Sequence, residues 1–282
     1  MPNLYVTLDT LKGTGALNVG TGTALDLRLL GVLEGVSRQC DQYCGRNFFQ
    51  LEATKTFNGR GTLELPVADL IGITSLKEDT NADGTFETTW DAADYLLWPY
   101  NADPTSDWGR PYRRLIVNES SNGTQDTFLK GQRNYQIVGT WGFQRVTKDS
   151  GLTGTIATTT GTALTLSGSA SGTIEAGMTL RIGTAELMYV RSWSGTTATV
   201  TRGVNGSTAA TATAVAVNVV VYPVLLQEAV IVQASRLWKR KDSAYASQVG
   251  LPETGQMLVW TGGLDPDVKA LLNQGGLRRL IA

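Results

Sequence analysis

One long stretch of this sequence is almost free of charge, and it limits how the chain can be divided into folded parts. Residues 151–217 hold five charged side chains and no Pro, Lys or Asp, whereas the other 215 residues hold 44 charges. Apolar residues alternate there with Thr and Ser, which is typical of β-strands. The pattern predicts a small all-β domain at 150–217, either a sandwich or a barrel, inserted into a core formed by 1–149 and 218–282. A disordered linker is the alternative, but the apolar content argues against it.

The sequence on both sides of this stretch carries helical patterns. Apolar residues recur every three or four positions from Leu25 to Cys44, and Gly45 is well placed to end that helix. A second helix begins after Pro223 and is apolar around much of its circumference, and a short one follows Asp265. Between the first two helices, residues 53–141 read as strands separated by turn dipeptides. We therefore expect an α+β protein with a helical core (long helices at about 23–44 and 223–241) and a β-sandwich-like strand region.

The composition excludes much of enzyme chemistry. Histidine is absent, which removes histidine-based triads, dyads and zinc sites. Cys40 and Cys44 have no third thiol with which to close a zinc site, and two small buried side chains are the alternative. No phosphate-binding loop occurs, and no spacing singles out a carboxylate pair such as Glu52 with Glu64. We expect neither enzymatic activity nor a cofactor.

Charge and hydropathy also limit the partners. The formal net charge is -1, which does not favour tight binding of nucleic acid. The N-terminal sequence lacks the pattern of a secretory signal, and the most apolar run, 214–232, is interrupted by polar residues. A cytoplasmically made protein with no membrane contact is expected.

Two further patterns each allow two interpretations. The run Asp79 to Gly84 matches the first half of a calcium loop, but Trp90 stands where the final ligand should be, and a plain hairpin turn is the alternative. Near Trp108 and Tyr112 lie three arginines, at 110, 113 and 114. This mixture is found in single-stranded nucleic-acid sites, but also on an edge strand with solvated charges or on a surface between subunits.

Several segments carry motifs that follow one another in a fixed order. The stretch 41–48, with Tyr43-Cys44-Gly45-Arg46 at a helix end, looks like a signature of the head-tail connector (adaptor) proteins of tailed bacteriophages. Further segments agree in the same order, namely 54–61, 73–76, 83–88, 94–99, 139–142, 234–242, 265–268 and 271–272. The resemblance covers roughly 3–149 and 218–280, and 200–210 is similar to a small β-module of phage virion proteins.

The resemblance implies a structural virion protein at the phage neck. It implies a ring of about twelve copies that docks below the portal, joins head to tail and lets double-stranded DNA pass during ejection without binding it specifically. The implied partners are the portal protein, a tail or stopper (terminator) protein and further copies of the chain. By the same analogy, the C-terminal tail would meet the portal through Leu277, Arg278, Arg279, Leu280 and Ile281. Two glycines precede this tail and nothing local anchors it, so we expect it to be disordered until it docks.

A different class of function remains open at this point. The β-domain could make the chain a capsid or tail decoration protein, or a protein that binds host glycans. Its recognition surface would then include Tyr189, Trp193 and Arg202. A carboxylate-based glycosidase is a third possibility.

Overall fold

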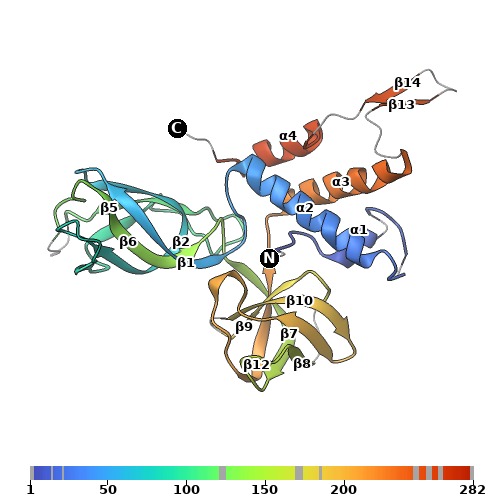
Figure 1. Ribbon diagram of the computed structural model, residues 1–282, viewed down its shortest axis with the longest axis horizontal. Helices are drawn as coiled ribbons and strands as arrows, with labels where there is room; N and C mark the ends of the chain where they lie inside the picture. The colour runs from blue at the N-terminus through green and yellow to red at the C-terminus, as the bar shows by residue number, and fades with distance from the viewer. Residues whose placement is uncertain are drawn as a thin grey trace. The chain divides into compact units, whose positions relative to one another are not determined.

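The structure is a computed structural model of the 282-residue chain (Figure 1). It describes residues 3–13, 15–20, 22–120, 125–168, 174–183, 186–243, 248–251, 256–259 and 263–279. Within these residues it contains four α-helices, a six-stranded sheet, a closed barrel of six strands and a two-stranded sheet. The strands β13 (Gln248–Leu251) and β14 (Gln256–Val259) form the last of these.

The helices are α1 (Leu8–Lys12), α2 (Asp26–Cys44), α3 (Val224–Lys239) and α4 (Pro266–Gln274). Helix α2 buries one side chain every three or four residues, at Leu29, Leu33, Val36, Cys40 and Cys44, which is the spacing of one helix face. Helices α2 and α3 lie side by side (Figure 1). None of the helices in the described part of the chain is long and apolar enough to cross a membrane.

An ion-paired contact joins α3 to α4. The guanidinium of Arg236 pairs with both carboxylates at the start of α4, Asp265 (3.2 Å) and Asp267. The side-chain oxygen of Gln233 accepts a hydrogen bond of 3.0 Å from the backbone amide of Asp265. The ion pairs hold the start of the last helix against α3, and Gln233 satisfies one of the amides that the helix leaves without a partner among its own carbonyls.

The six-stranded sheet follows α2 in the chain. Its strands are β1 (Leu51–Gly59), β2 (Glu64–Glu78), β3 (Thr88–Trp90), β4 (Tyr95–Trp98), β5 (Tyr112–Val117) and β6 (Gly131–Trp141). The order is β1-β6-β2-β5-β4, with β3 paired to β2, and every pairing is antiparallel. The sheet has its own apolar core, in which Trp90 stacks on Phe128 with ring centroids 4.6 Å apart.

The barrel follows the sheet. Its strands are β7 (Val146–Ile156), β8 (Ala163–Ser167), β9 (Thr179–Ile182), β10 (Glu186–Ser194), β11 (Thr197–Thr201) and β12 (Ala212–Val221). They close in the order β10-β11-β8-β7-β12-β9. The alternating side chains Leu164 and Leu166 on β8, and Ala198 and Val200 on β11, point inward and are buried. Closure leaves no free strand edge.

The predicted fold class is wrong. The chain is mostly β, with 39% strand and 22% helix, and its helices are too few and too short to form its core. The strand region is a single sheet and not a sandwich. The reason is that each β-structure closes its own apolar core, so the helices organise only part of the chain.

The chain divides into two compact units. One contains Met1–Arg46, Thr147–Val204 and Thr208–Ala282, and we call it the helix-barrel unit. The other contains Asn47–Val146 and Asn205–Ser207, and we call it the sheet unit. The predicted domains, 1–149 with 218–282 and 150–217, stay a prediction.

Candidate functional site

The residues of the family-like signature hold the C-terminal segment of the chain. Helix α2 ends at Gly45, which has left-handed backbone angles (φ 65°, ψ 31°). Beyond this end, the carbonyl of Cys44 accepts a hydrogen bond of 2.8 Å from the backbone amide of Arg279. The hydroxyl of Tyr43 donates to Asn273 Oδ1 at 3.2 Å. The signature therefore forms a seat, made by the C-terminal end of α2, for the segment that follows α4.

Three of the five predicted portal-interface residues lie at this seat. Leu277 is 3% exposed, and its amide donates to the carbonyl of Leu272 at 3.2 Å. The guanidinium of Arg278 lies over the ring of Tyr43, 4.9 Å from its centroid, and its side chain is exposed. Arg279 is half-buried. Leu280 and Ile281 lie outside the described residues.

These contacts differ from the expectation that nothing local anchors the tail. The two glycines before it, Gly275 and Gly276, form the turn that ends α4, and the amide of Gly276 donates to Asn273 O at 3.1 Å. That turn brings Leu277 back into an apolar environment. A hydrophobic contact just beyond a helix end is a common way to terminate a helix. In the sequence, the glycine pair followed by Leu was the signal for this anchoring of the tail.

The predicted residues of the β-domain do not form one exposed surface. Tyr189 is 6% exposed, and burial raises the pKa of its hydroxyl to about 12. Trp193 is half-buried against the barrel core. Arg202 forms a buried ion pair with Glu186, with 2.6 Å between Nε and Oε1. These three side chains stabilise the barrel, and their positions do not favour glycan recognition.

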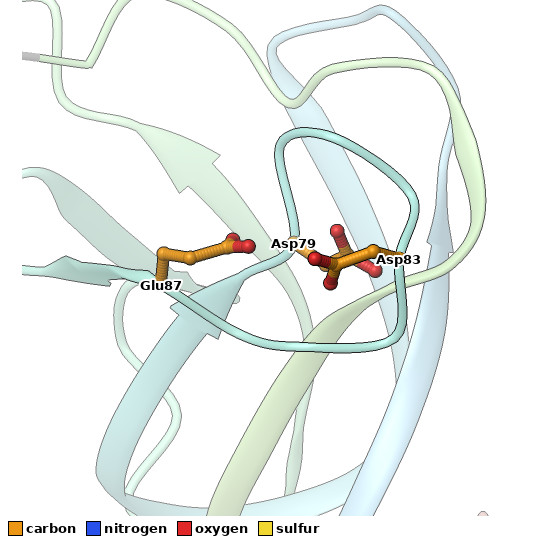
Figure 2. Close-up of side chains that lie close together, drawn as sticks. All are labelled: Asp79, Asp83 and Glu87. Atoms are coloured by element: carbon orange, nitrogen blue, oxygen red, sulfur yellow. The ribbon is translucent and has the colours of Figure 1, made fainter.

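The acidic loop between β2 and β3 gathers three carboxylates (Figure 2). One ligand oxygen from each of Asp79, Asp83 and Glu87 lies within 4.8 Å of the others. Asp79 already accepts hydrogen bonds from the amides of Ala82 (2.7 Å) and Gly84 (2.9 Å). The spacing of a calcium loop predicts the last carboxylate at position 90, whereas the structure brings Glu87 to the other two.

The geometry of this loop agrees with the hairpin-turn interpretation. Asp83 accepts from the amide of Thr85 at 2.7 Å, and this bond holds the pKa of the exposed Asp83 carboxyl below its usual value. Asn81 accepts from the amide of Asp83 at 3.0 Å. Asp and Asn side chains that bond the backbone two residues on are the usual stabilisers of turns.

The cysteine pair has no chemical role that its environment supports. Cys40 and Cys44 are free thiols on the buried face of α2, and both are 0% exposed. Burial raises the pKa of each thiol to about 12. A thiol that stays protonated is neither a nucleophile nor a metal ligand.

The arginines near Trp108 are mostly engaged within the sheet. Arg114 pairs with Glu64 at 3.0 Å, and Arg113 lies 3.8 Å from Asp69. Arg110 and Trp108 itself are exposed on the loop between β4 and β5. The pairs favour the interpretation of a charged strand surface over a site for single-stranded nucleic acid, which needs cations free to meet phosphates.

Sequence comparisons add no relative to this picture. No protein-family model, no curated protein and no solved structure matches the chain. Function is therefore argued from the residues and from their geometry.

Proposed function

We propose that this chain is a head-tail connector subunit of a tailed bacteriophage. In this proposal it forms a ring of about twelve copies below the portal, joins head to tail and surrounds the DNA channel. It belongs in the neck of the virion and is made in the cytoplasm of the host bacterium. The ordered resemblance of 41–48 and the later segments supports the proposal.

One observation carries it. The signature residues Tyr43 and Cys44 contact the C-terminal segment that the resemblance assigns to the portal. The two features are more than 200 residues apart in the chain, and the resemblance that suggested them did not require that they touch. Their contact gives the signature a physical role, which is to hold the base of the portal-binding tail.

Such a seat makes docking energetically easier. Ordering the backbone of one residue costs about 1–2 kcal/mol. Residues 277–279 are already held by a buried leucine, a backbone hydrogen bond and a cation-π contact. These three residues then need no further ordering when the tail meets a portal subunit.

The electrostatics suit a channel that DNA must leave. The formal net charge is -1. Each phosphate that a protein neutralises adds affinity, and a strongly basic lining would retard passage of the duplex. A nearly neutral chain is compatible with a ring through which DNA moves without specific binding.

The test places charge on the tail without disturbing its seat. In the double variant Leu280→Asp/Ile281→Asp, we expect wild-type unfolding behaviour and loss of binding to purified portal rings in a co-sedimentation assay. Leu129→Asp, a similar change at an exposed leucine of the sheet unit, is the control and should bind like wild type. Portal binding by the double variant at the wild-type level would contradict the proposal.

A further inference from the structure

An exposed tryptophan stands on a tightly bonded loop of the sheet unit. Trp108 is 91% exposed. The amide of Gly109 donates to Ser106 O at 3.0 Å, and the amide of Ser106 donates to Asp103 O at 3.2 Å. A Cβ atom added at Gly109 would lie 1.6 Å from Asp103 O, so the loop is closed as tightly as its backbone allows. The indole is therefore held out on a fixed support.

Such exposure is unusual for this side chain. Tryptophan is highly buried on average, because its large apolar ring gains more than most side chains from leaving water. Tryptophan is also among the residues that contribute most to protein-protein binding, usually by filling a pocket on the partner. A rigid support adds to this because little entropy is lost when the ring is captured.

The helix-barrel unit carries a pocket of a suitable size. Its volume is about 220 Å³. A cavity of roughly 150 Å³ holds a benzene ring, and pockets for drug-sized ligands begin at about 300 Å³. The volume therefore suits a single bicyclic side chain. Its apolar lining includes Leu4, Val6, Met178 and 219–221.

The polar lining of this pocket complements an indole with a neighbouring cation. Glu175 lines the pocket and is half-buried. Its Oε2 atom accepts no hydrogen bond from the described residues, and burial raises the pKa of the carboxyl. An indole N–H or a guanidinium would supply the missing donor or charge. Arg110 lies two residues after Trp108 and is exposed, so both groups come from one loop.

We propose that Trp108 of one copy inserts into the pocket lined by Thr10, Glu175 and Met178 on the next copy. The inference rests on the proposed function, in which the chain forms a ring. Trp108 and the pocket are different surfaces of the chain, so the contact is head-to-tail, and head-to-tail contacts build a ring when the rotation between neighbouring copies closes.

The first test measures self-association of the full chain by sedimentation velocity. Trp108→Ala removes the inserted side chain, and Thr10→Trp fills the pocket from an exposed position in its lining. Each change should weaken self-association about tenfold or more, as expected for a buried aromatic anchor. Leu63→Ala, at another exposed apolar residue of the sheet unit, should change it less than about twofold. Wild-type association by Trp108→Ala, or a wild-type chain that stays monomeric, would overturn the inference.

The second test asks whether the contact joins two copies. Asp107→Cys keeps Trp108 in place, and Thr10→Cys lies at the pocket rim. When the two single variants are mixed under mild oxidation, a disulfide-linked heterodimer should form, whereas Glu119→Cys in place of Asp107→Cys should give none. The native thiols of Cys40 and Cys44 are buried and do not compete. Equal yields from the two mixtures would contradict the inference.

Failure of the inference is distinguishable from failure of the proposed function. Rings that still form with Trp108→Ala would remove this contact and leave the connector proposal standing. Absence of the chain from purified virions would remove the connector proposal, whatever holds the copies together in solution.

Discussion

At the scale of single residues, the pair Glu186 and Arg202 shows most clearly how the surroundings of a side chain in the fold determine what it does. Both side chains are buried, and the guanidinium meets the carboxylate through two bonds of 2.6 and 2.7 Å. The carboxylate also accepts from the amides of Gly203 (3.1 Å) and Ala210 (2.9 Å). An arginine in a nearly uncharged stretch suggests an exposed residue. Its partner, Glu186, lies sixteen positions earlier on β10, and sequence spacing does not reveal the pair.

Breaking this pair should strongly destabilise the barrel. Arg202→Met leaves the Glu186 carboxylate buried without its cation, so we expect the free energy of unfolding to fall by about 3–5 kcal/mol. Arg191→Met is a matched control, because Arg191 is exposed and should cost no more than about 0.5 kcal/mol. Urea unfolding measures both. Similar losses for the two variants would show that the buried pair contributes no more to the free energy of unfolding than an exposed arginine does.

The same carboxylate makes stability depend on pH. Burial alone would raise the pKa of Glu186, but the bonds from Arg202 and from the two amides outweigh burial and lower it. A lowered folded-state pKa stabilises the protein above the unfolded value of about 4.3, and this contribution is lost as the pH falls further. The stability difference between wild type and Glu186→Gln should therefore shrink when urea unfolding is repeated below about pH 4. A difference that grows on acidification would contradict this assignment.

The two thiols provide a prediction about reactivity. Cys40 and Cys44 are buried and have pKa values of about 12. Neither should react with a thiol-modifying disulfide reagent at about pH 8 in the native chain, and both should react after denaturation in urea. Rapid native labelling, followed by absorbance, would show that this face of α2 opens readily.

At the scale of elements, the end of α2 can be tested through two of its glycines. Gly45 has a φ of 65°, and an added Cβ would meet only Arg279 Cβ at 3.9 Å, so backbone strain and not lack of space is the cost. Gly45→Ala should lower the free energy of unfolding by about 1–2 kcal/mol. Gly35→Ala, exposed within the same helix with nothing near its Cβ, should raise it by about 0.5–1 kcal/mol. Chemical unfolding that gives the same sign for both variants would contradict this interpretation.

Local sequence patterns predicted individual elements well. The expected helices at about 23–44 and 223–241 correspond to Asp26–Cys44 and Val224–Lys239. Periodicity and terminal residues act over a few positions, so they can be read from the sequence. The placement of Gly45 as the end of the first helix is confirmed.

The pairing of the strands was harder to predict from the sequence than the helices were. Residues 53–141 read as strands separated by turn dipeptides, but β2 runs from Glu64 to Glu78 as a single strand. Pro66 and the charged Asp69 interrupt the alternation, and the pairing register with β5 shifts between Pro66 and Leu70. A bulge of this kind absorbs residues that would otherwise end a strand. The sheet order depends on contacts between distant segments, which a local pattern does not specify.

At the scale of the whole molecule, the error in fold class has a physical cause. The helical patterns in the sequence are long and regular, and they predict a helical main core. The sheet and the barrel each bury a separate apolar cluster, so most residues belong to β-structure. Alternation left a sandwich and a barrel equally open for the second cluster, because both bury every other side chain.

The candidate site was predictable only in part. The terminal residues Leu277 to Arg279 were singled out by resemblance, and their seat on α2 became visible only in three dimensions. Tyr189 and Arg202 were chosen for their side-chain type, and the barrel buries both. Side-chain type suggests which residues can recognise a partner, but burial decides which of them are available to do so.

The connector proposal is tested most directly by counting this chain in purified virions of its source phage by quantitative mass spectrometry. We predict about a dozen copies per particle, as a closed ring at a single neck requires. Hundreds of copies would assign the chain to the capsid surface or to the tail tube, and absence from the particle would contradict a role in the neck.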